Sequence, residues 1–80
     1  MNESYFVEDL DVFFSKVDMM IEKNMLRGKK GIMLLSVKFL EPSWVELFEN
    51  RYKHLKYSVT SKVCRLKNWD IIIEWNNTKK

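Results

Sequence analysis

Hydrophobic residues recur along the chain with two different periods, and each period predicts a different kind of element. In residues 5–26 apolar side chains return every three or four positions, which places them on one face of a helix. Gly28 follows, and glycine readily takes the left-handed conformation that ends helices. We therefore predict one long amphipathic helix, whose core stripe consists of Phe6, Leu10, Phe13, Val17, Met20 and Ile21.

Residues 31–40 are the most apolar run, with glycine at the start and Glu41-Pro42 at the end. Ten residues are too few to cross a bilayer, and the content of Ile, Val and Phe favours a strand. Both alternating sets of side chains are largely apolar, so we predict an inner strand with one face fully covered and the other partly covered. The first set is Met33, Leu35, Val37 and Phe39, and the second contains Ile32 and Leu34.

A second helix is predicted from Trp44 to about Leu55. Ser43 and Glu46 have the spacing of a capping box, in which each side chain accepts a hydrogen bond from the other residue's backbone N–H. The core stripe of this helix consists of Val45, Phe48, Tyr52 and Leu55.

Two strands, over residues 57–65 and 69–76, are predicted to form a C-terminal hairpin. A three-residue loop with Asn68 in the left-handed conformation places Arg65 opposite Trp69 and Val63 opposite Ile71. This register keeps the apolar residues of both strands on one face. The triple isoleucine of the last strand is apolar on both faces, which predicts an inner position.

The order of elements predicts one α+β domain over residues 1–80 with the pattern αβαββ. The helix between the first two strands makes a crossover, so these strands run parallel, and the last strand lies between them in a three-stranded mixed sheet of order 1-3-2. This topology is similar to that of the C-terminal domain of initiation factor 3 and of Alba chromatin proteins without their first strand. Both groups bind nucleic acid as small basic domains, so the resemblance implies the same class of ligand.

Charge is unevenly distributed along the chain, although the net charge is only +3. Residues 1–25 hold two bases and six acids, whereas residues 26–80 hold twelve bases and five acids. We expect a small non-enzymatic protein that contacts nucleic acid through a basic C-terminal hairpin and tail, with the rings of Tyr57 and Trp69 nearby as stacking surfaces. The predicted contact residues are Lys29, Lys30, Lys62, Arg65, Lys67, Trp69, Lys79 and Lys80.

A protein-binding module or inhibitor, of the kind that phages and mobile elements encode, is the alternative. Its surfaces are the acidic side of the first helix and the partly covered face of the sheet. The residues assigned to this interface are Glu8, Asp11, Asp18, Glu22, Ile32, Leu34 and Ile72. The edge of the strand over residues 31–40 lacks a neighbour in the predicted order, and together with the partly covered face this leads us to expect a homodimer.

An enzyme is the least supported class. The single histidine, His54, and the single cysteine, Cys64, fall on different predicted elements, and no group of residues has the spacing of a metal or cofactor site. The acidic polar face of the first helix disfavours a membrane surface. The N-terminus lacks the pattern of a signal peptide, so we expect a cytoplasmic protein.

Overall fold

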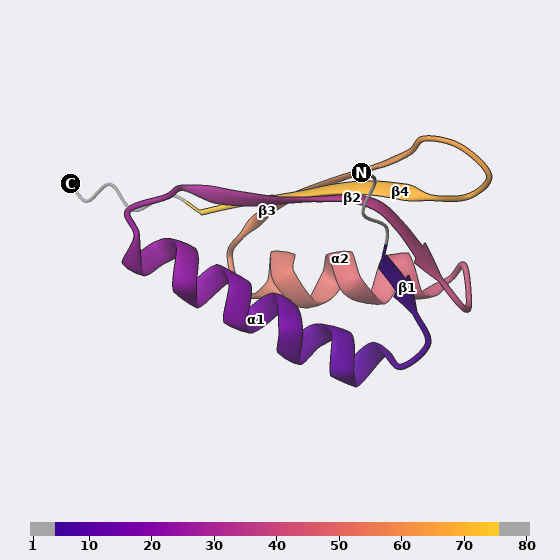
Figure 1. The fold of residues 1–80 in the computed structure, drawn as a ribbon, viewed down its shortest axis with the longest axis horizontal. Helices are drawn as coiled ribbons and strands as arrows, with labels where there is room; N and C mark the ends of the chain where they lie inside the picture. The colour runs from indigo at the N-terminus through magenta and orange to yellow at the C-terminus, as the bar shows by residue number, and fades with distance from the viewer. Residues whose placement is uncertain (1–4, 76–80) are drawn as a thin grey trace.

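The computed structural model describes residues 5–75, which build a four-stranded mixed sheet with both helices against one face (Figure 1). Strand order is β1-β2-β4-β3, with β1 parallel to β2 and the other neighbours antiparallel. The α+β class, the crossover between parallel strands and the inner position of the last strand are confirmed. The predicted number of strands is wrong. The elements are β1 (Tyr5–Val7), α1 (Leu10–Leu26), β2 (Gly31–Phe39), α2 (Trp44–His54), β3 (Ser58–Val63) and β4 (Trp69–Glu74).

The additional strand is β1, which replaces the beginning of the predicted first helix. Asp9 is the N-cap of α1, and its Oδ1 atom accepts hydrogen bonds from the backbone N–H groups of Asp11 (3.1 Å) and Val12 (3.3 Å). The three residues of β1 pair in parallel with the C-terminal end of β2. Because β1 covers this part of the β2 edge, the edge argument for a homodimer does not apply there, and association of two copies stays a prediction.

Strand β2 contains a bulge around Ser36, where the alternation of its side chains between the two faces of the sheet is reversed. The register with β4 shifts between Leu34 and Val37, and Ser36 has a φ angle of 57°, in the left-handed region. One extra residue in a strand turns every later side chain to the opposite face. Residues Ile32, Leu34, Val37 and Phe39 therefore all point toward the helices and are buried. The predicted division of this strand into two alternating faces is wrong.

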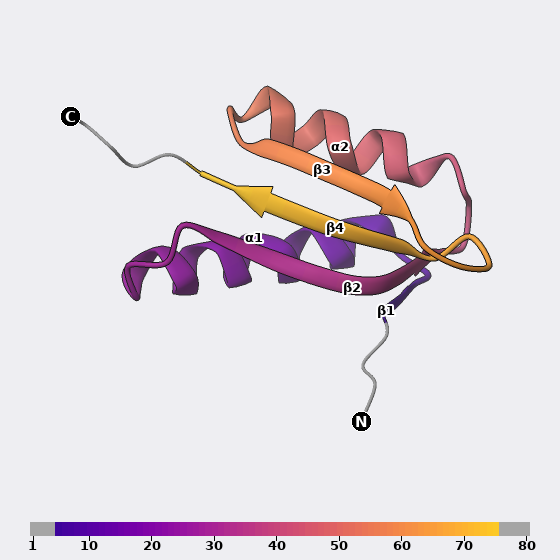
Figure 2. The ribbon, with the colours of Figure 1, turned by 90° about the horizontal axis from the view of Figure 1, so that it is seen from above.

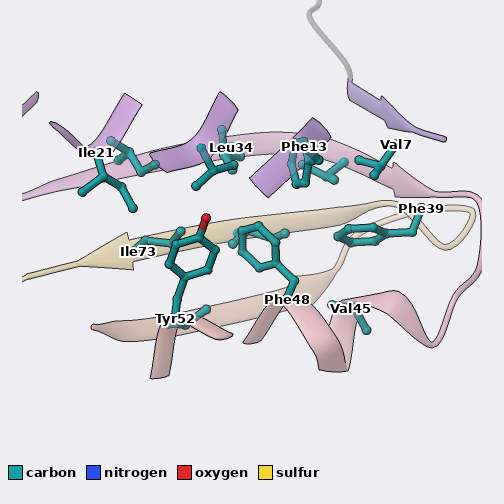
Figure 3. Packing of buried hydrophobic residues seen from close by; sticks show 14 of the residues in the cluster. Val7, Phe13, Ile21, Leu34, Phe39, Val45, Phe48, Tyr52 and Ile73 are labelled. Carbon is teal, nitrogen blue, oxygen red and sulfur yellow. The ribbon is translucent and has the colours of Figure 1, made fainter. Parts of the chain in front are cut away.

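The core lies between the sheet and the two helices and is rich in aromatic rings (Figure 3). Phe48 of α2 is its centre, with ring centroids 5.5 Å from Phe13 of α1 and 4.9 Å from Tyr52. Its ring also lies 6.2 Å from that of Phe39 in β2. Both helices thus bury their apolar stripes on the same side of the sheet, and no helix or strand of residues 5–75 covers the other side.

Helix α2 occupies the predicted residues but begins differently. Ser43 already has helical backbone angles (φ −70°, ψ −13°) and makes no side-chain cap, so the predicted capping box is wrong. A backbone turn starts the helix instead, with the N–H of Trp44 donating to the carbonyl of Glu41 (2.9 Å).

The β3–β4 hairpin has the predicted faces in a register shifted by two residues. Val63, rather than Arg65, lies opposite Trp69. Leu66 (φ 55°) and Lys67 (φ 63°) take the left-handed conformation that was predicted for Asn68. Since side chains alternate with a period of two, a shift by two leaves every residue on the same face, and the hydrophobic pattern cannot distinguish the two registers.

Candidate functional site

The sheet surface opposite the helices is the first candidate site. Figure 2 looks down on this surface, and no helix or strand of residues 5–75 lies in front of it there. Three apolar side chains on it are about half exposed: Phe6 at 54%, Met33 at 58% and Leu35 at 49%. Met33 lies opposite Ile72, and Ile72 lies opposite Thr60, so an apolar stripe crosses the inner strands. We define the open face as Phe6, Met33, Leu35, Lys38, Thr60, Lys62, Asp70 and Ile72.

Charge is divided between the two layers of the fold. The strands and their connections (residues 5–7, 27–40 and 57–75, the sheet layer) carry seven Lys and Arg against two Asp and Glu, a net charge of +5. The helices and their flanks (residues 8–26 and 41–56, the helix layer) carry five Lys and Arg against eight Asp and Glu, a net charge of −3. Within residues 5–75 the sheet layer is therefore net positive and the helix layer is net negative. The excess of the sheet layer lies in its end turns, because Lys38 and Lys62 on the open-face side are balanced by Asp70 and Glu74.

Asp70, one of the two acids of the sheet layer, accepts hydrogen bonds within the fold. The Asp70 carboxylate accepts hydrogen bonds from the backbone N–H of Ser36 (3.0 Å) and from the thiol of Cys64 (3.3 Å). Local desolvation, together with the Asp70 hydrogen bond, raises the pKa of the Cys64 thiol. The sulfur is thus kept as a thiol donor to Asp70 rather than a thiolate.

The predicted nucleic-acid contacts do not form one cluster. Lys29 and Lys30 lie in the turn between α1 and β2, whereas Arg65 and Lys67 lie in the hairpin at the opposite end of the sheet (Figure 1). Lys62 is between them on the open face.

The remaining predicted contacts have different positions. Trp69 is partly buried and packs against the core, as does Tyr57, so neither ring is a free stacking surface. Lys79 and Lys80 lie outside the described residues.

The predicted acidic interface is interrupted at Asp18. Its carboxylate pairs with the guanidinium of Arg51 (2.6 Å) and accepts a hydrogen bond from the hydroxyl of Tyr52 (2.6 Å). Burial of the ring raises the pKa of Tyr52, and the bond to Asp18 raises it further. Asp18 thus joins α1 to α2. Glu8, Asp11 and Glu22 are exposed.

The apolar members of the predicted interface are also divided. Ile32 (8% exposed) and Leu34 (0%) face the helices, because the bulge places them in the core, so their assignment to an exposed surface is wrong. Ile72 does lie on the open face. Sequence reasoning missed Phe6, Met33 and Leu35 there. The sequence signal for these residues was that both alternating sets in residues 31–40 are apolar. A strand with a bulge gives this pattern, and so does a strand that is covered on both faces.

Other kinds of site receive no support within residues 5–75. His54 ends α2 just before β3 begins, and Cys64 follows the end of β3, so the length of that strand separates them. The described residues contain no group of three or more His, Cys, Asp or Glu placed to hold a metal ion. Neither described helix combines the length and apolar character needed to traverse a lipid bilayer.

Comparison with known proteins adds no further constraint. No protein-family model, curated protein or solved structure matches the chain.

Proposed function

We propose that this protein is a small non-enzymatic nucleic-acid-binding protein whose contact surface is the open face together with the bases at both ends of the sheet. The observation that carries the proposal is the division of charge, +5 in the sheet layer against −3 in the helix layer. A polyanion is attracted to the first layer and repelled by the second, which sets the side from which it approaches.

The shape and chemistry of the open face support an extended strand with unpaired bases. β2 is nine residues long, which corresponds to about 30 Å. The apolar stripe of Met33, Leu35 and Ile72 provides contact area for bases, and Phe6 adds one exposed ring at the edge. Lys38 in β2 and Lys62 in β3 both lie beside this stripe toward the β3–β4 loop, where ammonium groups can reach phosphates.

The experiment is a fluorescence-anisotropy titration of labelled single-stranded RNA, single-stranded DNA and duplex DNA at several salt concentrations. We expect the single strands to bind, with an affinity that falls steeply as salt rises. The double variant Lys38→Gln, Lys62→Gln should flatten the logarithmic salt dependence by roughly 1.4, about 0.7 for each phosphate that the protein no longer neutralises.

The matched control is Lys16→Gln, Lys23→Gln, which makes the same change of charge on α1 in the helix layer. This variant should bind as the unmodified protein does. Equal losses of affinity in both double variants would mean that only net charge matters and would refute the open face as the contact surface. Absence of binding at low salt would refute the proposed function itself.

A second candidate, a protein-binding module, is favoured by a groove between the two helices. The groove has a volume of about 230 Å³ and combines apolar walls with the exposed carboxylate of Glu22, while its second carboxylate, Asp18, is paired with Arg51. It suits a basic amphipathic peptide helix. Binding of a labelled Lys/Leu model peptide that is weakened by Glu22→Gln would support it. The lining residues are Asp18, Ile21, Glu22, Met25, Leu55 and Tyr57.

A further inference from the structure

A cleft of about 330 Å³ lies at one end of the sheet, where three segments distant in sequence meet. These segments are the α1–β2 turn, the α2–β3 connection and the end of β4. The lining residues are Lys30, Lys56, Ser58, Glu74 and Trp75. Ser58 and Glu74 are cross-strand partners next to the pair of Thr60 and Ile72, so the cleft continues the open face.

Trp75 fixes the turn that carries Lys30. Its ring is almost completely buried, and the indole N–H donates to the carbonyl of Lys29 (2.9 Å). Its backbone N–H donates to the carbonyl of Lys30 (3.0 Å). The turn is therefore held against the end of β4, and the cleft wall that carries Lys30 is fixed in place.

Lys56 occupies a backbone position that favours glycine. It has a φ angle of 72° and directly follows the C-cap of α2, where its N–H donates to the carbonyl of Lys53 and the next N–H to that of Tyr52, both at 2.9 Å. This is a Schellman motif. In α1 the equivalent residue is Gly28, with a φ angle of 78°. A long side chain in a strained conformation is an indication that the side chain itself has a role.

The cleft has the charge and donors of an anion site. Within residues 5–75 the only ion pair joins Arg51 to Asp18, so Lys30 and Lys56 make no direct ion pair, and two lysines face the single carboxylate of Glu74 in the cleft lining. With the hydroxyl of Ser58 they offer hydrogen-bond donors from two walls. We propose that this cleft holds one phosphate group of the nucleic-acid strand on the open face, an inference that rests on the proposed function. Glu74 lowers the positive potential of the cleft, which keeps a net charge of +1 from its two lysines and one carboxylate.

The test exploits the conformation of Lys56. Lys56→Gly removes the ammonium group and also relieves the left-handed strain, so we expect a melting temperature a few degrees higher together with weaker oligonucleotide binding. Lys56→Gln removes the charge and keeps the strain, so the loss of binding should be the same without a gain in stability. For both variants we expect several-fold weaker binding at about 50 mM salt and a salt dependence flatter by about 0.7. Lys30→Gln should have the same effect on binding.

The control is Lys53→Gln, a neutralisation in the last turn of α2 away from the cleft. It should leave affinity unchanged. If the unmodified protein binds and the Lys56 and Lys30 variants bind with the same affinity, the phosphate cleft is refuted and the proposed function stands. The same conclusion follows if Lys53→Gln loses as much affinity as the Lys56 variants. Absence of oligonucleotide binding by the unmodified protein would overturn both proposals.

Discussion

Substitution of Asp70 should separate stability from nucleic-acid binding. The Asp70 carboxylate accepts a hydrogen bond from the backbone N–H of Ser36. Ser36 forms the bulge that places Leu34 and Val37 on the same side of β2. Asp70 also lies opposite Lys62 across β3 and β4, on the open face. It therefore maintains the bulge and lowers the positive potential of the proposed contact surface.

The magnitudes follow from these two interactions. A hydrogen bond to a charged acceptor contributes about 1.5–3 kcal/mol when buried, and Asp70 is half-buried, so Asp70→Ala should lower the free energy of unfolding by about 1–2 kcal/mol. A chain of this length has roughly 4–12 kcal/mol in total, so the change is easily measured. Asp70→Asn keeps an acceptor oxygen and removes the charge. It should cost less than about 1 kcal/mol and should strengthen oligonucleotide binding, because the negative charge opposite Lys62 is gone.

Urea denaturation monitored by tryptophan fluorescence gives the first quantity, and anisotropy at low salt gives the second. We expect Asp70→Ala to be clearly destabilised, Asp70→Asn to be nearly as stable as the unmodified protein, and Asp70→Asn to bind more tightly. Two results would refute this reasoning. One is an Asp70→Ala variant within about 0.3 kcal/mol of the unmodified protein, and the other is an Asp70→Asn variant with unchanged or weaker binding.

Three further predictions test the fold. Leu34→Ala should cost about 2–5 kcal/mol in urea denaturation, whereas Leu35→Ala on the open face should cost less than about 0.5 kcal/mol, and similar costs would contradict the placement of Leu34 in the core and Leu35 on the open face. The pKa of Tyr52 is raised above its usual 10.0 in the folded state, so the unfolded chain loses this proton first, and above pH 10 the free energy of unfolding should fall by about 1.4 kcal/mol per pH unit. Tyr52→Phe should lack this contribution. The same alkaline slope in Tyr52→Phe and in the unmodified protein would disprove it. Gly31→Ala should be destabilising by roughly 1–3 kcal/mol, because the added Cβ would lie 2.8 Å from the carbonyl oxygen of Ile73, and a melting temperature equal to that of the unmodified protein would show that the backbone adapts.

The N-terminal boundary shows where local pattern is insufficient. Tyr5, Phe6 and Val7 fit the helical stripe that continues through α1, and they fit a strand equally well. The choice is made by Asp9, which caps the helix, and by pairing of β1 with β2 more than thirty residues away. The cap could have been read from the sequence, because aspartate before an apolar helical stripe is a start signal. The pairing could not, because it depends on tertiary contact.

The bulge in β2 explains why Ile32 and Leu34 were assigned to the wrong face of the sheet from the sequence. Strict alternation predicts two apolar faces, and the prediction of a partly covered face with Ile32 and Leu34 followed from it. A single residue with a positive φ angle, Ser36, exchanges the faces halfway along the strand. Its stabilising partner, Asp70, lies 34 residues away. The basic character of the C-terminal part was predictable from composition, whereas its concentration in the sheet layer required the arrangement of the strands.

The most direct test of the central claim is a methyl NMR titration of methionine-labelled protein with a single-stranded oligonucleotide of about ten nucleotides. Met33 on the open face and Met19 on α1 are both 58% exposed, so they report on opposite layers with equal access to solvent. The account predicts that the Met33 methyl resonance shifts as the oligonucleotide is added and that the Met19 resonance stays in place. A shift of Met19 without Met33, or no shift of either at low salt, would contradict it.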